Sequence, residues 1–295
     1  MNELQEAIDD YLIELAGVKR ASDKTVISYR IDLHQFNSII TSFNIETLGR
    51  ISEKQLKRYL FKLNESGLSK QSVSRKLSSV RGFFNYLIRN ELIENNPAIN
   101  IKNPRTEKRL PQTINLDSFS KIIKLIEEEK KGEEALLYKI FFEVLYGGSL
   151  RVSELCALDK NDFNPATNTI KVFGKGAKER IIPIGKSLTD LIKKYLSIRN
   201  DKSNLALFTT LKGRRLYPRL IHRVVSTYIS KVSDISKKSP HVLRHSSATH
   251  MLDNGADLMA VKEILGHENL STTQIYTHVS VERLKKTFKN AHPKS

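Results

Sequence analysis

The chain has 295 residues, and its 49 Lys and Arg against 32 Asp and Glu give a net charge of +17. With 39% hydrophobic and 27% charged residues it supports a folded core, which excludes wholesale disorder, and its length predicts about two domains. A positive surplus of this size indicates a polyanionic partner, with nucleic acid first and an anionic membrane surface second.

The first hundred residues predict a helical domain. Apolar residues repeat at helical spacing from Ile8 to Leu15, from Thr25 to Ile40, from Ile51 to Leu63 and from Ser69 to Arg89. The last of these helices carries basic residues opposite its apolar stripe. Such a face suits a phosphate backbone, and an ordinary solvated face fits the pattern equally well. The predicted DNA-binding residues of this helix are Lys70, Arg75, Lys76 and Arg81.

A polar segment with two prolines and no apolar periodicity, residues 103–113, predicts a linker. It separates a helical domain at residues 1–102 from a second domain at residues 114–295. The charge surplus is uneven, because residues 171–250 hold 18 Lys and Arg against four acidic residues, a net charge of +14. A short run of like charges is usually a solvated face, but this density suits a surface that neutralises DNA phosphates.

The second domain mixes helices with a small sheet. Helical periodicity covers Leu116 to Glu129 and Ala135 to Tyr146. Two β-branched runs, Thr169–Phe173 and Arg180–Pro183, flank a glycine-rich turn and predict a β-hairpin, after which helices resume beyond Leu188. The predicted fold is therefore mainly α with a small antiparallel β-sheet in the second domain, an α+β class.

Cysteine use and hydropathy restrict the compartment. A single cysteine, Cys156, excludes an internal disulfide and a cysteine-based zinc site, and is typical of a reducing cytosol. The acidic segment Met1–Gly17 lacks the basic start of a signal peptide. The longest apolar stretch, Leu136–Leu145, contains Lys139 and Glu143 and falls short of the ~20 residues of a membrane span. We therefore expect a cytoplasmic protein that does not cross a membrane.

Five short segments of the second domain combine residue types suited to phosphate chemistry. They are Leu150–Leu155, Gly174–Gly176, His241–His245, Leu265–His267 and Gln274–Tyr276. Each alone is weak, because such an arginine is usually a helix cap, such a lysine an exposed turn residue and such a tyrosine a core residue. Together, in this order, they resemble the active site of the tyrosine recombinase/integrase family. The stretch Ser239–Val279 resembles the Xer subgroup of that family almost residue for residue.

The resemblance covers the whole chain. Thr25–Phe36 and Gln71–Pro97 match the family's N-terminal core-binding domain, and Asn290–Pro293 resembles a Xer C-terminus. One departure is Ser149, where Xer proteins usually carry glycine. The resemblance implies a two-domain, C-shaped clamp on duplex DNA, with the basic 103–113 linker crossing the backbone.

Breaking a DNA phosphodiester without metal requires a nucleophile, cations for the developing charge and an acid for the leaving oxygen. Tyr276 is the candidate nucleophile, and its phenol needs a cationic site or a base nearby because its ordinary pKa is roughly 10. Arg151 and Arg244 suit two non-bridging phosphate oxygens, since a guanidinium donates in a planar fork. As in the family's hairpin, Lys175 is expected to protonate the leaving 5′ oxygen.

Further residues support this centre. His241 is expected to accept a proton or to donate to the phosphate, and His267 to donate to it as well. Glu154, one helical turn after Arg151, is expected to orient the basic residues or His241. The remaining predicted DNA contacts are Lys178 and Arg180 on the hairpin.

Three further histidines favour packing roles over a metal site. They are His245, His250 and His278. The spacing of His241 and His245 superficially resembles a zinc helix, but the glutamate of His-Glu-x-x-His and a third ligand are missing. The glycines around Lys175 also fail the spacing of an ATP-binding loop. We therefore expect neither a metal nor a cofactor.

The predicted function is that of a Xer-type site-specific recombinase. The resemblance implies a 3′-phosphotyrosyl intermediate, a Holliday junction, and a homo-tetramer, or a hetero-tetramer with a paralogue, on two DNA sites. It implies resolution of chromosome or plasmid dimers at a dif-like site, with a DNA translocase as a further partner. The C-terminal segment 281–290 would dock into a neighbouring protomer. The alternatives are an integrase or transposase of a mobile element, a type IB topoisomerase, and a catalytically silent architectural DNA-binding protein.

Overall fold

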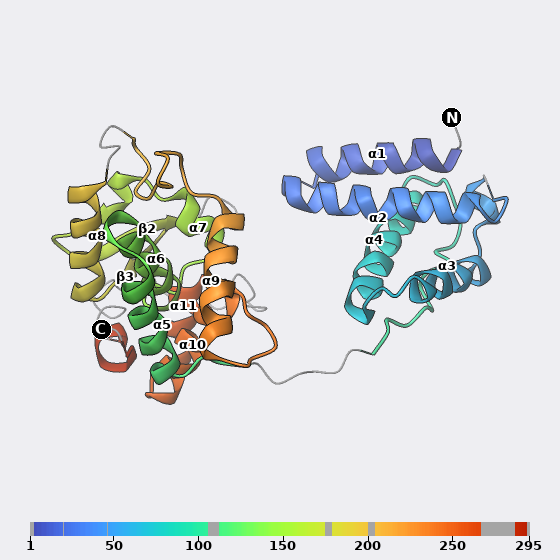
Figure 1. Ribbon diagram of the computed structural model, residues 1–295. Helices are drawn as coiled ribbons and strands as arrows, with labels where there is room; N and C mark the ends of the chain where they lie inside the picture. The colour runs from blue at the N-terminus through green and yellow to red at the C-terminus, as the bar shows by residue number, and fades with distance from the viewer. Residues whose placement is uncertain are drawn as a thin grey trace. The chain divides into compact units, whose positions relative to one another are not determined.

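The computed structural model describes residues 3–19, 21–45, 47–105, 112–174, 179–199, 204–266 and 287–293. The chain divides into two compact units, Met1–Arg109 and Leu110–Ser295 (Figure 1). The boundary between them falls within the segment expected to be a linker. Each unit has its own hydrophobic core.

The first unit consists of helices joined by loops, with no strand among its described residues. Its elements are α1 (Glu3–Gly17), α2 (Asp23–Thr41), the 3₁₀ turn η1 (Leu48–Arg50), α3 (Glu53–Glu65) and α4 (Lys70–Arg89). Buried aromatic rings fill the space between the helices, and Phe36 meets Tyr59 edge to face at 5.1 Å between ring centroids. The four helices that the apolar periodicity predicted are confirmed.

A buried carboxylate joins α2 to α4. Asp32 is fully buried, and it accepts hydrogen bonds from the Lys76 ammonium and the Ser79 hydroxyl, both at 2.9 Å, and from the Arg75 guanidinium. We expected Lys76 on the exposed face of α4. This is wrong, since its side chain is only 7% exposed and turned toward Asp32. The charge pairing that draws it inward involves a residue 44 positions away, so helical periodicity did not reveal it.

Replacing Asp32 with alanine is expected to destabilise the first unit by about 3–5 kcal/mol, because the buried Lys76 ammonium loses its only carboxylate partner among the described residues. The midpoint of urea unfolding measures the effect. Arg75→Gln is the matched control, since the Arg75 side chain is 51% exposed, and its loss should be below about 1 kcal/mol. Equal losses in the two variants would contradict the assignment.

Arg81 fastens the end of the first unit to α4. Its guanidinium donates to the backbone carbonyls of Ala98 and Ile101 and, at 3.0 Å, to the side chain of Asn103. These bonds hold the chain where the predicted linker begins. Arg81 therefore has a structural role, and its contact with DNA stays a prediction.

The second unit is mainly helical and carries one three-stranded sheet. Its elements are α5 (Leu116–Glu129), α6 (Gly132–Tyr146), α7 (Val152–Ala157), the 3₁₀ turn η2 (Lys160–Asp162), β1 (Phe163–Asn164), β2 (Thr169–Phe173), β3 (Glu179–Pro183), α8 (Lys186–Ile198), α9 (Pro218–Val232), α10 (Pro240–Asp253) and α11 (Leu258–Leu265). The apolar helix α6 contacts α5, α8, α9 and α10, so it forms the centre of this core.

The sheet is antiparallel, in the order β1-β2-β3. Lys171 pairs with Ile181 in the hairpin, which confirms the two predicted strands with β3 starting one residue earlier than expected. The two-residue strand β1 was not predicted, because it is too short to show alternation. Helices and a small antiparallel sheet thus confirm the predicted fold class. None of the helices in the described ranges is long and apolar enough to cross a membrane.

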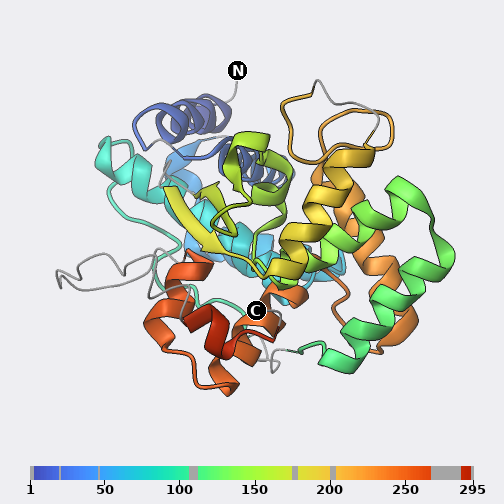
Figure 2. The same cartoon turned by 90° about the vertical axis from the view of Figure 1, so that its left-hand side faces the viewer.

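The C-terminal residues 287–293 lie against their own unit. Residues 287–291 form a short helical turn, drawn in red beside α10 in Figure 2. The Asn254 side chain donates to the Ala291 carbonyl at 2.9 Å, and Phe288 and His292 are buried. Of the segment expected to dock into a neighbouring protomer, residues 281–286 lie outside the described residues, and docking between protomers stays a prediction.

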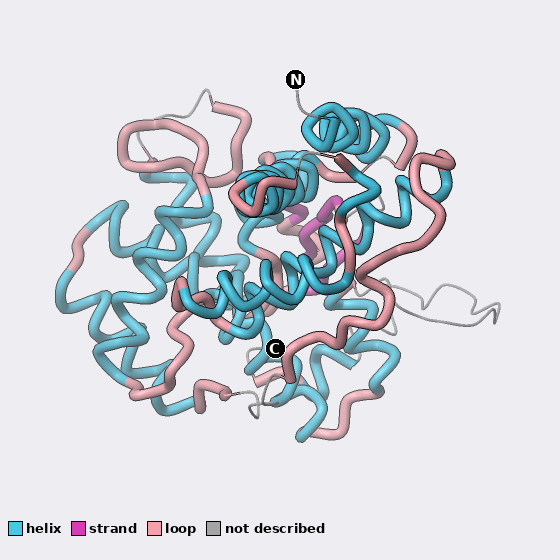
Figure 3. Tube along the Cα trace, turned by 90° about the vertical axis from the view of Figure 1, so that its right-hand side faces the viewer, coloured by secondary structure: helices cyan, strands magenta, loops and turns pink. Residues whose placement is uncertain are grey.

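The strands are confined to one small patch of the trace in Figure 3. Three structural features next to each other in the second unit carry the residues of interest. They are the turn from α6 to α7, the hairpin strand β3, and the pair α10 and α11, which contact each other.

Candidate active site

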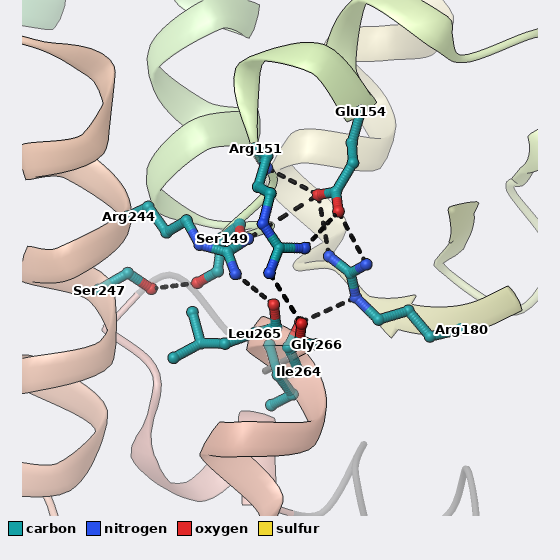
Figure 4. A network of polar contacts seen from close by, with 9 residues as sticks. All are labelled: Ser149, Arg151, Glu154, Arg180, Arg244, Ser247, Ile264, Leu265 and Gly266. Atoms are coloured by element: carbon teal, nitrogen blue, oxygen red, sulfur yellow. Dashed lines mark hydrogen bonds and ion pairs between the residues drawn. The ribbon is translucent and has the colours of Figure 1, made fainter. Parts of the chain in front are cut away.

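Three arginines from three elements converge on one buried glutamate (Figure 4). Arg180 on β3 binds Glu154 with both terminal nitrogens, each at 2.9 Å. Arg151, immediately before α7, donates to the same carboxylate at 2.8 Å, and Arg244 on α10 lies 3.8 Å from it. We call these four residues the arginine cluster.

The position of Glu154 follows from local helix chemistry. It is the third residue of α7, and its carboxylate accepts the backbone N–H of Arg151 at 2.7 Å, as an acidic residue in the first turn commonly does. The same carboxylate therefore caps α7 and holds the arginines. Glu154 thus contacts basic residues, and none of its hydrogen bonds within the described ranges goes to His241. Its role in orienting the arginines for catalysis stays a prediction.

The last carbonyls of α11 hold the other side of the arginine cluster. Arg180 donates to the Ile264 carbonyl, Arg244 to that of Leu265 and Arg151 to that of Gly266. These carbonyls face outward at a helix end, where the backbone lacks partners and the helix dipole favours cations. Three consecutive residues thus bind three different arginines.

Gly266 suits this helix end for two reasons. Its φ of 60° lies in the left-handed region, which costs a side-chain-bearing residue energy. A Cβ atom at this position would also lie 3.0 Å from the Arg180 guanidinium, closer than such contacts normally allow.

The charge balance of the arginine cluster favours an anion. Three guanidinium groups against one carboxylate leave a surplus of two positive charges. Burial works to raise the pKa of Glu154, but hydrogen bonds from the Arg180 side chain and the Arg151 backbone hold that pKa below its usual value. Burial and the charge of Arg151 lower the pKa of Arg244 to about 10, so it remains protonated at neutral pH.

Both predicted phosphate-binding arginines have donors that no described residue uses. A guanidinium has five N–H groups. Arg151 and Arg244 each donate two hydrogen bonds to residues that the structure describes. The Arg151 side chain is 34% exposed and Arg244 9%. Because these hydrogen bonds already hold the two arginines in place, their other N–H groups can bind a phosphate without first reorganising.

His241 is the described residue for the second predicted role in the reaction, which is proton transfer. It lies in the first turn of α10, and its ring centroid is 6.5 Å from that of His222 on α9. Desolvation, followed by the nearby His222, Arg244 and Arg151, lowers the pKa of His241. Its imidazole is therefore mainly neutral at pH 7 and able to accept a proton.

Comparison with known proteins decides the family. The sequence profile described as the phage integrase family matches residues 113–283, more than half of the chain. The profile described as the N-terminal SAM-like domain of phage integrases matches residues 8–91.

The chain belongs to the phage integrase family.

Individual relatives make its place in the family more specific. The tyrosine recombinase XerC of Pelobacter propionicus is 38% identical over 100% of this chain and 98% of its own length. The tyrosine recombinase XerD of Oceanobacillus iheyensis is 34% identical over 99% of this chain and 100% of its own. A solved XerH site-specific recombinase, bound to a palindromic difH substrate in a post-cleavage complex, is 25% identical with a TM-score of 0.73, covering 97% of this chain and 90% of that one.

These likenesses confirm the predicted tyrosine recombinase family and its Xer subgroup. The protein is a site-specific recombinase, an enzyme that cuts and rejoins DNA strands.

The structure describes some of the predicted catalytic residues of this recombinase and not others. Arg151, Glu154 and Arg244 come together in the arginine cluster, and His241 lies at the start of the helix that carries Arg244. The residues that fall outside the described part of the chain are Lys175, Lys178, His267, Tyr276 and His278.

Arg180 is turned away from the surface on which a DNA contact was expected. Its side chain is only 12% exposed, and each of its three guanidinium nitrogens donates a hydrogen bond, two to Glu154 and one to the Ile264 carbonyl. The structure thus adds Arg180 to the arginine cluster as the residue that binds Glu154 most directly. Sequence reasoning noted its charge and its place on the hairpin, but not a partner 26 residues away.

A basic pocket on the recombinase surface was missed by sequence reasoning. It has a volume of about 450 Å³ and includes His222, the neighbour of His241. Its lining residues are Tyr217, Arg219, Leu220, His222, Arg223, Ser226 and Lys238. They lie within the stretch of net charge +14, which was the available signal, but no motif distinguished them.

The other histidines in described positions do not form a metal centre. His250 shares a 2.7 Å hydrogen bond with the Tyr146 hydroxyl, and burial lowers its pKa, which fits the packing role expected for it. No group of three or more potential ligands among His, Cys, Asp and Glu occurs in the ranges that the structure describes.

Proposed function

We propose that this recombinase cuts DNA by attack of Tyr276 on a phosphodiester held by Arg151 and Arg244. The observation that carries the proposal is the arginine cluster, two of whose members have donors that no described residue uses, beside a histidine of lowered pKa. Its surplus of two positive charges matches the two negative charges that a pentavalent phosphorus carries.

The proposed chemistry exchanges one ester for another. The phenol oxygen of Tyr276 bonds to phosphorus while its proton passes to neutral His241, and the bond from phosphorus to the 5′ oxygen breaks. Lys175 gives a proton to the leaving oxygen, and His267 donates to the phosphate. The resulting 3′-phosphotyrosyl ester keeps the energy of the original bond, so a 5′ hydroxyl from a partner strand reverses the reaction and produces a Holliday junction.

The architecture proposed for the complex is a clamp. Residues 1–102 form a DNA-binding domain, residues 103–113 a linker and residues 114–295 the catalytic domain. Exposed basic residues of α4, such as Lys70 and Arg75, face the phosphate backbone. Four copies act on two DNA sites, and the segment 281–290 docks between protomers.

The proposed biological role is the resolution of chromosome or plasmid dimers in the cytoplasm. The support is the difH site in the complex of the XerH relative, which makes a dif-like site the natural substrate class. Similarity to both a XerC and a XerD leaves a homo-tetramer and a pairing with a paralogue as the two forms of the assembly, with a DNA translocase as a further partner.

A nicked suicide duplex carrying the cognate site tests this function. We expect the wild-type enzyme to form a covalent protein–DNA adduct in EDTA, because the proposed chemistry uses no metal. Digestion of the adduct and mass spectrometry should recover the DNA on the peptide that contains Tyr276. DNA attached to any of the other tyrosines, or cleavage without an adduct, would refute the proposal.

The basic pocket beside His241 should contact phosphates next to the cut. Arg219→Gln and Arg223→Gln are each expected to weaken binding of the site and to lower the slope of log affinity against log salt by about one. The cleavage rate at saturating DNA should stay unchanged. Fluorescence anisotropy at several salt concentrations measures the slope, and Lys193→Gln on α8, which lies outside the pocket, is the control. A lower cleavage rate with unchanged affinity would contradict a phosphate-binding role.

A further inference from the structure

Ser149 combines an unusual backbone with two contacts to α10. It lies in the turn between α6 and α7, is fully buried and has a φ of 50°. Its carbonyl accepts a hydrogen bond from Arg244, and its hydroxyl lies 2.6 Å from that of Ser247 (Figure 4). Ser247 follows Arg244 by three residues on α10, so it faces the same side of that helix.

The backbone of Ser149 is one that glycine adopts more easily. A left-handed residue with a Cβ atom is strained. The bond between the two hydroxyls offsets that strain and fixes the peptide whose carbonyl receives Arg244. A glycine would leave this peptide freer to rotate, because glycine populates both signs of φ.

The C-terminal residues extend this contact. His292 is 3% exposed, and its Nε2 lies 3.0 Å from the Ser247 hydroxyl and 3.3 Å from the Tyr146 carbonyl. A carbonyl only accepts, so the proton of His292 belongs on Nε2. That one N–H is shared between the Tyr146 carbonyl and the Ser247 hydroxyl, and the hydroxyl proton of Ser247 is then available to Ser149.

We propose that Ser149, Ser247 and His292 form a hydrogen-bonded chain of positioning residues that holds Arg244 in the orientation that binds the scissile phosphate. The inference rests on the proposed function, in which Arg244 contacts that phosphate. It gives the C-terminal residues 287–293 a specific effect on the reaction, transmitted through one side chain.

The decisive variant is Ser149→Gly, because it separates stability from catalysis. It removes the hydroxyl but relieves the left-handed strain, so its melting temperature should match or exceed that of the wild type. Its single-turnover cleavage of the suicide duplex at saturating DNA should nevertheless fall by about ten- to a hundredfold, since small displacements of a binding group cost rates of this order. Affinity for the site should not change.

Ser247→Ala and His292→Ala test the rest of the chain. Each should lower the cleavage rate in the same direction, with a smaller loss for His292, which lies one residue further from Ser149. The double variant Ser149→Gly with Ser247→Ala should be no slower than the slower single variant, because both changes remove one and the same bond.

Ser246→Ala is the matched control. Ser246 is the buried neighbour of Ser247 on α10, but it binds the Val242 carbonyl and the Ile114 backbone N–H instead of Ser149. The Ser246→Ala variant should be less stable than the wild type and should cleave at the same rate.

If the wild type forms the adduct and Ser149→Gly cleaves equally fast, the positioning role is wrong while the proposed function stands. If the wild type forms no adduct, the proposed function itself fails.

Discussion

Replacing Tyr276 with phenylalanine is expected to abolish the covalent protein–DNA adduct and to leave binding of the duplex unchanged. The substitution removes one oxygen, which is the proposed nucleophile, and none of the four residues of the arginine cluster can form a stable ester with phosphorus. Loss of a nucleophile commonly lowers turnover by about 10⁴-fold or more. Gel electrophoresis of the adduct under denaturing conditions measures the loss, and anisotropy measures the affinity.

The control for this variant is Tyr138→Phe, which removes a hydroxyl from α6 outside the arginine cluster. It should form adduct at the wild-type rate. An adduct that persists in Tyr276→Phe assigns the nucleophile to another residue. A parallel loss of DNA binding shows instead that Tyr276 positions the DNA.

Replacing Glu154 should have the second-largest effect, and it should act on folding and catalysis together. Glu154→Ala leaves three converging guanidinium groups without their carboxylate and α7 without its cap. Removing one partner of a buried charge pair typically costs about 3–5 kcal/mol. We therefore expect a large drop in the free energy of unfolding, and loss of cleavage in the protein that remains folded because Arg151 and Arg244 are no longer oriented.

The pH dependence of stability identifies the charge of Glu154 as the cause. Its pKa is lowered from 4.5 in the folded state, so its contribution is fully present above that value and is lost as pH falls through the lowered pKa. The free energy of unfolding of the wild type, measured in urea, should fall as the pH drops below about 4.5. Glu154→Gln should remove part of this dependence on pH. Glu128→Gln on the exposed face of α5 is the control and should change stability by less than about 0.5 kcal/mol. An unchanged acid slope in Glu154→Gln would assign the effect to other carboxylates.

Elements that depend on local chemistry were predictable from the sequence. The helices of the first unit follow from apolar residues three or four apart, and the hairpin from two β-branched runs around glycines. Glu154 was correctly associated with basic residues because it follows Arg151 by one helical turn, so that interaction is also local.

Features that depend on distant partners were not predictable. Lys76 was expected on a surface, but Asp32 from another helix draws it into the interior. Arg180 was expected to meet DNA, but a glutamate on α7 and a carbonyl on α11 receive its donors. The contact of Ser149 with Ser247 joins residues 98 positions apart, so the sequence indicated only that the serine was unusual. In each case tertiary packing, which leaves no periodic signal, decided the outcome.

The end of α11 couples the proposed phosphate-binding arginines to the helix that precedes Tyr276 in the sequence. The carbonyls of residues 264–266 hold all three arginines, and Tyr276, the proposed nucleophile, follows Gly266 by only ten positions. Unwinding this last turn therefore means breaking three charge-assisted hydrogen bonds at once. By thermodynamic reciprocity, any partner that stabilises this last turn strengthens phosphate binding by the same factor by which the phosphate strengthens that partner's hold.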